Sequence, residues 1–342
     1  MNWRRLLLPF SGVYWGITTI RNKFFDWGLM RTTSFDLPII NVGNLSVGGT
    51  GKSPHVMYLI DLLKDHKMTC TLSRGYGRKT SGFRIANYDS KVYDIGDEPM
   101  QFFRRFKNKI LISVCESRVF GVQSLLKHYY PELIILDDAF QHRKIKAGFN
   151  ILLTDYNNPY FEDYLLPGGD LRESRGGANR ADIIIVTKCP DAVPEDRLQQ
   201  FHNKIGVKKN QQLFFSKIIY DEVIIGLNHS IHKTEWLNKN VILVTGIANP
   251  DSLVTFAEAN FKNVLHLKYP DHHNFKDVEI DYIRKRFAET EGDKIILTTE
   301  KDYMRLFEEN SLQNNLYYLP IGIELNDKEK FNQTILDYVR TH

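Results

Sequence analysis

The segment that most restricts the fold of this 342-residue chain is NVGNLSVGGTGKSPHVMYLI, residues 41–60. An apolar stretch at 37–42 leads into a glycine-rich turn, and Lys52, Ser53 and an apolar-periodic segment follow. This order predicts a strand, a loop and a helix. Glycines let successive backbone N–H groups turn inward around a phosphate, and the helix directs its positive end at the same anion. The segment therefore predicts a nucleoside triphosphate site rather than an ordinary turn before a surface helix.

The glycines of this loop follow the Walker pattern only in part. The pattern places a glycine five residues before Gly51, where this chain has Ser46, so Gly48 and Gly49 would form the turn instead. The lysine would bind the β- and γ-phosphates of ATP, and the serine hydroxyl would bind magnesium. The residues expected to contact the nucleotide are Ser46, Val47, Gly48, Gly49, Thr50, Gly51, Lys52, Ser53 and Pro54.

Length and composition are those of an ordinary globular protein. At 342 residues the chain exceeds one typical domain, so we expect one large unit or two packed units. The net charge of +4 is too weak to indicate a nucleic-acid partner, and none is expected. Cys70, Cys115 and Cys189 have no C-x-x-C spacing, so neither a metal site nor a disulfide framework is predicted. This pattern fits the reducing cytoplasm.

Short apolar runs alternate with helical patterns along most of the chain. Continuous apolar strands separated by helices indicate a parallel sheet covered on both faces. We therefore expect an α/β fold with a P-loop NTPase-type parallel sheet core, a second, smaller α/β lobe and a cleft between the two. The expected strands are 37–42, 68–72, 110–114, 133–136, 151–153 and 183–186 in the core, and 241–244, 264–267 and 295–297 in the second lobe.

The expected domain boundaries follow from this alternation and from a weakly periodic, polar stretch near the middle. A membrane-associated helical segment would occupy 1–35, and the P-loop core would occupy 36–190. An inter-lobe link would occupy 191–235. The second lobe, which completes the cleft, would occupy 236–342.

Residues 1–30 combine arginines with a long uncharged run, Leu6 to Ile20. The run is shorter than the about 20 residues that a transmembrane helix needs. A signal peptide is the main alternative, but no small-x-small cleavage site follows. Basic and aromatic residues from Arg21 to Trp27 suit the boundary of lipid headgroups. We expect a helix that lies on the cytoplasmic face of a membrane, with a helix packed on its own domain as the alternative.

LIILDDAFQHR, residues 133–143, is an apolar strand that ends in Asp137 and Asp138. A carboxylate at the end of a strand beside a P-loop can bind magnesium directly or through water. The two carboxylates would lie on opposite sides of an extended chain, so they are expected to have different roles. An ordinary turn or helix-capping aspartate would explain one of them but not the pair.

YDIGDEPMQF, residues 93–102, places Asp97 and Glu98 at an expected helix start. Acidic residues are common at that position merely as helix caps. Beside a polyphosphate, however, a carboxylate can act as the base for an incoming hydroxyl or as a metal ligand.

LPGGDLRES, residues 165–174, is a turn that carries Asp170, Arg172 and Glu173. The planar guanidinium group of arginine matches the geometry of phosphate, so this turn is a candidate for phosphate binding. A surface salt bridge is the alternative.

KYPDHHNF, residues 268–275, follows a strand of the second lobe. Two histidines beside an aspartate resemble part of a zinc site, but no third and fourth ligand occur at metal spacing. Proton transfer by His272 or His273, oriented by Asp271, is the better chemical interpretation. TTEKDYMRL, residues 298–306, ends another strand and is expected to face the same cleft.

Taken in order, these stretches resemble the tetraacyldisaccharide 4'-kinase family of lipid A biosynthesis. The shared motifs are VGNLSVGGTGKSP, SRGYGR, GDEP, LDDAFQH, LPGGDLRE, VTKC, PDHHNF and TEKD, and they run from residue 41 to residue 302. The aromatic N-terminal segment is also typical of that family. One departure is Ala139, where the family usually has glycine after the two aspartates, and it affects only the local turn.

The resemblance implies a membrane-associated P-loop kinase of Gram-negative bacteria. Such a kinase uses ATP and Mg²⁺ to phosphorylate the 4'-hydroxyl of an acylated glucosamine disaccharide 1-phosphate, which gives lipid IVA, at the cytoplasmic face of the inner membrane. Carried over by motif, Asp97 would act as the base with His272 or His273. The metal would be surrounded by Ser53, Glu98, Asp137 and Asp138. The residues expected to bind the acceptor are Arg74, Gln141, His142, Arg172 and Glu173.

Two other functions fit part of this pattern. A P-loop ATPase or GTPase that drives assembly or metal delivery at the membrane would need a cluster of cysteines or histidines for metal transfer, and the cysteine spacing offers none. A membrane-bound nucleotide sensor would bind ATP without a base beside the phosphate, so Asp97 and a histidine would have no role in it. ATP turnover that depends on an acylated disaccharide separates both functions from the kinase.

Overall fold

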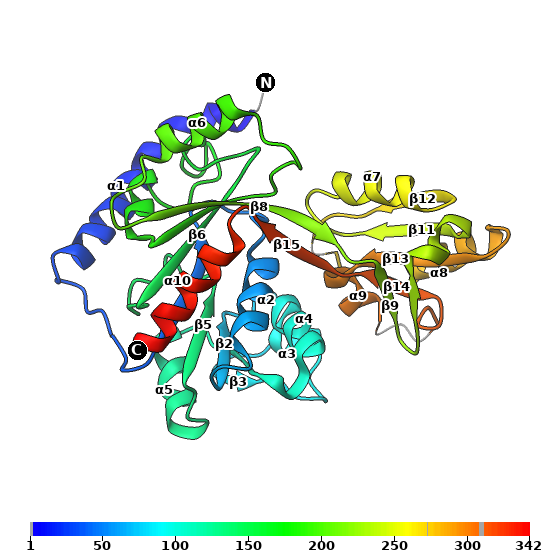
Figure 1. Ribbon diagram of the computed structural model, residues 1–342, viewed down its shortest axis with the longest axis horizontal. Coiled ribbons are helices and arrows are strands. Elements are labelled where there is room, and N and C mark those ends of the chain that lie inside the picture. Colours follow the sequence, from blue (N-terminus) through cyan, green and yellow to red (C-terminus); the bar gives the residue numbers. More distant parts are fainter. Residues whose placement is uncertain (1–2, 272, 308–310) are drawn as a thin grey trace. The chain divides into compact units, whose positions relative to one another are not determined.

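The computed structural model describes residues 3–271, 273–307 and 311–342. The chain forms two compact units, of which the first consists of Met1–Ile218 and Ile323–His342, and the second of Ile219–Gly322. The chain leaves the first unit along strand β8, Gln212–Tyr220, and returns along β15, Ile321–Leu325 (Figure 1).

The first unit is built on a nine-stranded sheet with the order β15-β8-β7-β6-β1-β5-β2-β4-β3. The strands from β8 to β4 in this order are parallel, and β3 is antiparallel to β4. β1, β2, β5 and β7 are buried along their whole length, as expected for a parallel sheet covered on both faces. The other strands of this sheet are β1 Ile39–Asn44, β2 Thr69–Ser73, β3 Arg84–Ile85, β4 Leu111–Val114, β5 Leu133–Asp137, β6 Phe149–Asp155 and β7 Ile183–Thr187.

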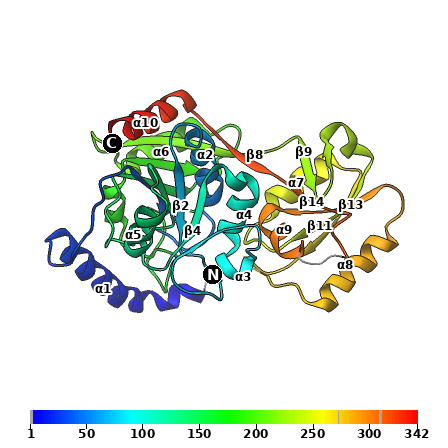
Figure 2. The same ribbon diagram turned by 90° about the horizontal axis from the view of Figure 1, so that it is seen from below.

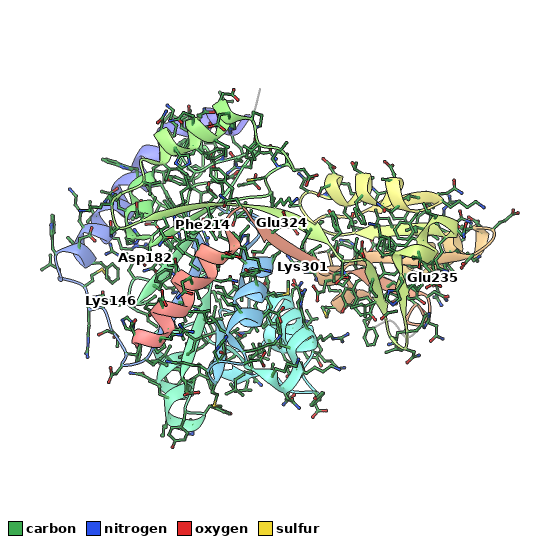
Figure 3. All side chains as sticks on the ribbon, viewed as in Figure 1. Lys146, Asp182, Phe214, Glu235, Lys301 and Glu324 are labelled. Atoms are coloured by element: carbon green, nitrogen blue, oxygen red, sulfur yellow. The ribbon has the colours of Figure 1, made fainter. Side chains whose placement is uncertain are left out.

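Helices cover both faces of this sheet. On one face, Phe201 of α6 belongs to the same buried cluster as Ile184 of β7. On the other face, α2 and α10 lie side by side (Figures 1 and 2), and Phe331 of α10 packs on Phe214 of β8, labelled in Figure 3, with 5.3 Å between ring centroids. The α-helices are α1 Leu8–Asp26, α2 Lys52–Leu63, α3 Val92–Ile95, α4 Asp97–Phe106, α5 Arg118–His128, α6 Glu195–Ile205 and α10 Lys328–Thr341, and the 3₁₀ helices are η1 Trp3–Leu7, η2 Lys107–Lys109 and η3 Arg175–Arg180.

Helix α1 packs on the first unit with its polar side and exposes its apolar side. Ser11 and Thr18 are buried, and the Ser11 hydroxyl donates to Leu165 O at 2.8 Å. A surface helix usually has the reverse arrangement. No described helix is long and apolar enough to cross a bilayer. Seven of the exposed large side chains recur three or four residues apart and form an apolar stripe that consists of Leu6, Phe10, Val13, Ile17, Ile20, Phe24 and Trp27.

The second unit is built on a six-stranded sheet with the order β10-β9-β14-β13-β11-β12. β12, β11, β13 and β14 are parallel, whereas β9 and β10 form an antiparallel pair and β9 is antiparallel to β14. In its core the buried Trp236 stacks on Phe261, with 5.2 Å between ring centroids. The elements are β9 Val223–Gly226, β10 Ser230–His232, η4 Lys233–Asn238, β11 Asn240–Thr245, α7 Asp251–Asn260, β12 Asn263–Lys268, α8 Asp277–Glu289, β13 Lys294–Thr299, α9 Glu300–Leu306 and β14 Leu316–Leu319.

The α/β fold expected from the sequence is confirmed, and every strand expected from an apolar run is present. However, the boundaries of the two units differ from those expected from the sequence. Residues 191–218, expected within the link, belong to the first unit because they form α6 and most of β8. Residues 323–342, expected in the second lobe, return to the first unit, since β15 pairs with β8 and α10 packs on the same sheet.

Candidate active site

Loops that follow neighbouring parallel strands meet at one edge of the first unit's sheet. β1 lies between β5 and β6, and β7 is the next strand after β6. The glycine-rich loop follows β1, residues 136–143 (LDDAFQHR) contain the end of β5, and residues 187–191 (TKCPD) begin at the last residue of β7. Because the carboxyl ends of parallel strands lie at the same edge, the topology brings these motifs together. This edge is where open α/β sheets bind their ligands.

The glycine-rich loop has the backbone of a phosphate-binding loop. Gly48 and Gly51 have φ of 100° and 81°, a left-handed region that a residue with a side chain enters only with strain. Helix α2 begins at Lys52, directly after Gly51, and no side-chain cap occupies its N-terminus. The Asn44 amide donates to the Thr50 hydroxyl at 2.8 Å across the base of the loop. The N-terminus of α2 is therefore suited to bind an anion.

Side chains of other elements bind two carbonyl groups of this loop. The Thr187 hydroxyl, at the end of β7, donates to Thr50 O at 2.9 Å. His55, in the first turn of α2, places Nδ1 2.7 Å from Gly51 O. Across a trans peptide, the C=O of one residue and the N–H of the next point in opposite directions. The N–H groups of Gly51 and Lys52 therefore point away from these contacts, as a phosphate-binding loop requires.

Lys52 lies beside the carboxylate of Asp138, which Arg172 also binds. Its Nζ is 3.8 Å from Asp138 Oδ2. Arg172 donates to both oxygens of Asp138, at 2.8 and 3.2 Å, and also to the side chain of Asn44. Burial alone would raise the pKa of Asp138, but the nearby cations, Lys52 first, outweigh burial and lower it. Asp138 is therefore an anion that can orient the P-loop lysine.

Asp137 is buried in a different electrostatic environment. Its Oδ2 accepts a hydrogen bond from Ser73 Oγ at 3.1 Å. Burial first, and then the charges of Glu98 and Asp138, raise the pKa of Asp137 to about 7. Strand β5 ends at Asp137, whereas Asp138 has φ 49° and has left the extended conformation. The two carboxylates diverge because the chain turns at Asp138, and not through the strand alternation expected from the sequence.

The donor set at this edge fits Mg²⁺. Glu98 and Asp138 both raise the pKa of Asp137, and such a concentration of negative charge is one that a divalent cation relieves. Among the described residues, no three His, Cys, Asp or Glu side chains form a ready-made metal cluster. Kinases hold Mg²⁺ with one or two carboxylates, the P-loop hydroxyl and the substrate phosphates, and Ser53 is the second residue of α2, where that hydroxyl usually stands.

Asp97 and Glu98 begin helix α4, as expected from the GDEP motif, and Asp97 is buried. Gly96 precedes them with φ 94°, and a Cβ at Gly96 would lie 2.8 Å from Tyr76 O. Glycine therefore lets the start of α4 pack against the SRGYGR loop. Asp97 belongs to the first unit and His272 to the second, so their pairing stays a prediction.

The expected acceptor-binding residue Glu173 lies between α1 and the end of β1. It is fully buried and accepts hydrogen bonds from Gln141 at 3.0 Å and from Arg180 at 2.8 Å. Asn22 of α1 donates to its other oxygen at 2.9 Å. Gln141 also donates to Asn44 O at 2.8 Å. Glu173 and Gln141 therefore join α1 to the base of the P-loop.

His142 and Arg74 differ in exposure. Arg74 is exposed, whereas His142 is partly buried. Burial first, and then the charges of Arg118 and Arg74, lower the pKa of His142 to about 4. Arg118 is itself buried and donates to Cys115 O at 2.8 Å and to Asp137 O at 3.1 Å. Contact of His142 or Arg74 with an acceptor stays a prediction.

In the second unit, Asp271 and His273 follow strand β12. His272 lies outside the described residues. His273 Nε2 is 2.8 Å from Glu279 Oε2, so its carboxylate partner is Glu279 and not the expected Asp271. Asp271 instead forms an ion pair with Lys301, with 4.0 Å between Asp271 Oδ1 and Lys301 Nζ.

The TEKD motif supports this turn within the second unit. Asp302 Oδ2 accepts the Gly246 N–H at 2.8 Å and the Thr299 hydroxyl at 2.8 Å. Arg305 donates to His273 O at 3.2 Å and lies 3.7 Å from Asp302. The loops after β11, β12 and β13 are therefore connected by polar contacts, as neighbouring parallel strands allow.

Several polar residues at the edge of the first sheet were missed by sequence reasoning. Lys188 pairs with Asp155 at 2.8 Å and also donates to Gly49 O. Its stretch, TKCPD, resembles the T-K-x-D nucleobase motif with one extra residue, which is a weak signal. An asparagine at a strand end, a histidine among apolar helix residues and an arginine at a helix start carry no such signal. The missed residues are Asn44, His55, Arg118 and Lys188.

The whole chain matches known proteins. The family model described as tetraacyldisaccharide-1-P 4'-kinase matches residues 3–340. The tetraacyldisaccharide 4'-kinase of Flavobacterium johnsoniae is 45% identical over 339 residues, which cover 98% of this chain and 97% of that relative. The tetraacyldisaccharide 4'-kinase of Bacteroides thetaiotaomicron is 42% identical over 353 residues, which cover 98% of this chain and 93% of that relative.

A solved structure agrees with these matches. The crystal structure of LpxK from Aquifex aeolicus in complex with ATP is similar with a TM-score of 0.79 and 31% sequence identity, and the match covers 98% of this chain and 99% of that chain. The ordered motifs, the P-loop architecture and the full-length matches lead to one assignment. This chain belongs to the tetraacyldisaccharide-1-P 4'-kinase family.

Proposed function

We propose that this chain transfers the γ-phosphate of ATP to the 4'-hydroxyl of a tetraacyldisaccharide 1-phosphate and so forms lipid IVA in lipid A biosynthesis. The observation that carries the proposal is the phosphate-binding loop, with Gly51 in the left-handed conformation directly before Lys52 and α2, in a chain that belongs to this kinase family over its whole length. ATP is the phosphate donor, and Mg²⁺ accompanies it in P-loop kinases.

The P-loop and its neighbours bind and align the triphosphate in this proposal. The N–H groups of Gly51 and Lys52 point away from the contacts behind the loop and so toward the anion. The Lys52 ammonium binds the β- and γ-phosphates. Asp138 lies 3.8 Å from it and keeps it near the loop, while Arg172 balances the charge of Asp138. The remaining loop residues, Ser46 to Pro54, surround the nucleotide.

Ser53, Glu98, Asp137 and Asp138 are proposed to surround Mg²⁺, directly or through water. The electrostatic coupling of the three carboxylates supports this assignment. Bound Mg²⁺ supplies positive charge where negative charge develops on the phosphate oxygens. The protein side chains then have to place the acceptor hydroxyl in line with the γ-phosphate and exclude water.

Asp97, together with His272, is proposed to accept the proton of the acceptor hydroxyl. A sugar hydroxyl has a pKa far above neutrality, and the phosphoryl-transfer transition state is loose, so the proton leaves late and alignment matters most. The burial of Asp97 at the start of α4 supports a role at a site that excludes water. Arg74, Gln141, His142, Arg172 and Glu173 are proposed to bind or support the acceptor.

The apolar stripe of α1 is proposed to bind the cytoplasmic surface of the inner membrane. Polar side chains of the helix, among them Ser11 and Asn22, form hydrogen bonds within the first unit. Its exposed side carries the large apolar side chains, with Lys23 and Arg31 exposed near its C-terminal end. A helix with this distribution lies in the boundary of lipid headgroups and acyl chains. It would bring the site to an acceptor that is itself a lipid.

An acceptor-dependent assay tests this function. The purified chain is given γ-labelled ATP and Mg²⁺, with and without tetraacyldisaccharide 1-phosphate in micelles, and label in the lipid fraction is measured. We expect transfer only with the acceptor, and a loss of about a hundredfold to a thousandfold in Lys52→Ala, because the phosphates lose their main side-chain cation. Lys64→Ala, after the other end of α2, serves as the matched control and should stay active.

The alternatives give different results. An ATP hydrolysis rate that is the same with and without acceptor would favour an ATPase. Nucleotide binding without turnover, in the presence of acceptor, would favour a sensor. Full transfer by Lys52→Ala would remove the P-loop assignment.

A further inference from the structure

His55 is a buried polar side chain with a partner at each ring nitrogen. Its Nδ1 lies 2.7 Å from Gly51 O and its Nε2 lies 3.0 Å from Ser216 Oγ. A carbonyl oxygen can only accept, so Nδ1 carries a proton. Burial lowers the pKa of His55 to about 4, so near pH 7 the ring is neutral and Nε2 accepts from the Ser216 hydroxyl. The two contacts therefore fix one tautomer and one orientation of the ring.

At Nδ1 the ring fixes the residue that closes the P-loop. The backbone N–H of His55 is 3.4 Å from Gly51 O, so the ring, at 2.7 Å, is the closer donor to this carbonyl. Gly51 has φ 81° and directly precedes Lys52. Because the Gly51 carbonyl and the Lys52 N–H belong to one rigid peptide plane, the ring also sets the direction of that N–H.

At Nε2 the ring contacts the strand along which the chain leaves the first unit. Ser216 lies two residues before Ile218, the last residue of the first unit's N-terminal segment. The neighbouring Phe215 N–H donates to the Asn326 side chain at 2.9 Å, and the Asn326 N–H donates to Phe215 O at 3.0 Å. Asn326 directly follows β15, the strand along which the chain returns. Ser216 therefore belongs to the pair of strands by which the chain passes between the units.

We propose that His55 is a positioning residue that couples nucleotide binding at the P-loop to strands β8 and β15. A phosphate that accepts the Lys52 N–H restrains the Gly51 peptide, and the ring carries this restraint through Ser216 to β8. The inference rests on the proposed function, because it needs a nucleotide in the loop. A histidine with a packing role alone would change stability but would not make the mobility of β8 depend on the nucleotide.

Hydrogen exchange of the full chain, with and without Mg²⁺ and a non-hydrolysable ATP analogue, tests the coupling. In the wild type we expect slower exchange in loop peptides at 46–53, and about fivefold slower exchange at 212–218 and 321–326, the change that one hydrogen bond produces. In Ser216→Ala the loop should still be protected while the response of both strands disappears. Ser216→Thr keeps a hydroxyl and should keep the response.

A matched control comes from the same helix. Tyr58 of α2 donates to the Asn332 side chain at 2.7 Å, so Tyr58→Phe removes one partly buried hydrogen bond without touching the His55 contacts and should keep the strand response. A strand response in Ser216→Ala equal to that of the wild type would overturn the coupling and leave the proposed function intact. So would wild-type protection confined to the loop. Absence of any loop protection in the wild type would overturn the coupling and ATP binding together.

Discussion

At the scale of single residues, the carboxylate of Asp138 lies beside two cations, Arg172 and Lys52. Arg172 binds both of its oxygens, and Lys52 lies 3.8 Å from one of them. If Arg172 were absent, Asp138 would be left to Lys52 alone, and the lysine would be drawn from the phosphates toward the carboxylate. Arg172 therefore matters for the nucleotide even though its direct partner is another protein side chain.

The contacts of Asp138 predict the effect of Arg172→Lys. Lysine keeps the charge but cannot bind both oxygens of Asp138 in one plane. We expect kcat/KM for ATP to fall about tenfold or more, which corresponds to roughly 1.4 kcal/mol of lost transition-state stabilisation. Steady-state kinetics with ATP varied at saturating acceptor measure this. Arg197→Lys is the matched control, because Arg197 of α6 pairs with Glu162 at 3.0 Å and should tolerate the change. Wild-type kinetics in Arg172→Lys would contradict the charge-sharing arrangement.

At the scale of elements, α1 differs from an ordinary surface helix because its polar side faces the protein. Removing α1 would remove the hydrogen bond that Asn22 donates to the fully buried Glu173. A deletion would therefore disturb the site as well as the membrane contact. Substitutions on the exposed side separate the two effects. Val13, Ile17 and Ile20 are 65%, 64% and 56% exposed and have few packing contacts to lose.

We predict that the triple variant Val13→Ser, Ile17→Ser, Ile20→Ser binds lipid vesicles at least about tenfold more weakly, because three aliphatic side chains no longer enter the lipid boundary. Its activity on acceptor dispersed in detergent should stay near that of the wild type. Vesicle co-sedimentation and the detergent assay measure the two properties. Leu237→Ser with Val278→Ser, two exposed apolar residues of the second unit, is the control. Equal loss of vesicle binding in both variants would mean that the stripe is not the membrane contact.

The sequence predicts elements well where the signal is local. β1, the glycine loop and α2 follow from the order of apolar residues, glycines, lysine and serine within residues 37–60. The polar contacts of α1 with the first unit could not be predicted, because the partners of Ser11 and Asn22 are more than 150 residues away in sequence. The return of α10 to the first unit could not be predicted either, since its partner Phe214 is distant in sequence and any apolar helix face would serve.

The same distinction holds for site residues. Lys52, Ser53 and the aspartates lie in motifs whose chemistry is visible from neighbours in the sequence. His55 has the pattern of a residue on the buried side of a helix, and its second partner, Ser216, is 161 residues away. Arg118 looks like an ordinary first-turn residue, and its partner Asp137 O lies on strand β5, 19 residues away. Residues that act by supporting a loop therefore escape sequence reasoning, because their partners come from tertiary structure.

At the scale of the whole molecule, the proposed base combines residues from two motifs that are distant in sequence, Asp97 from GDEP and His272 from PDHHNF. We predict that Asp97→Ala and His272→Ala each lower kcat about a hundredfold or more, as expected for a lost general base, with little change in ATP affinity. Because the pair would act as one group, the double variant should be hardly slower than either single variant.

The kcat values of the three variants decide this point. If the two losses multiply, the residues act independently and the pair is wrongly assigned. His273→Ala is the informative neighbour, because His273 pairs with Glu279 in the structure and should be less sensitive. A large loss of kcat in His273→Ala, without one in His272→Ala, would assign the partner of Asp97 to His273.

The most direct test of the whole account is the position of the phosphate in the product. The chain is incubated with ATP, Mg²⁺ and tetraacyldisaccharide 1-phosphate, and the lipid is analysed by ³¹P NMR while ADP is measured in parallel. We predict a new phosphate monoester on the 4' oxygen, an unchanged 1-phosphate, and one ADP for each product molecule. A phosphate at any other position, or ADP formed without a phosphorylated lipid, would contradict the account.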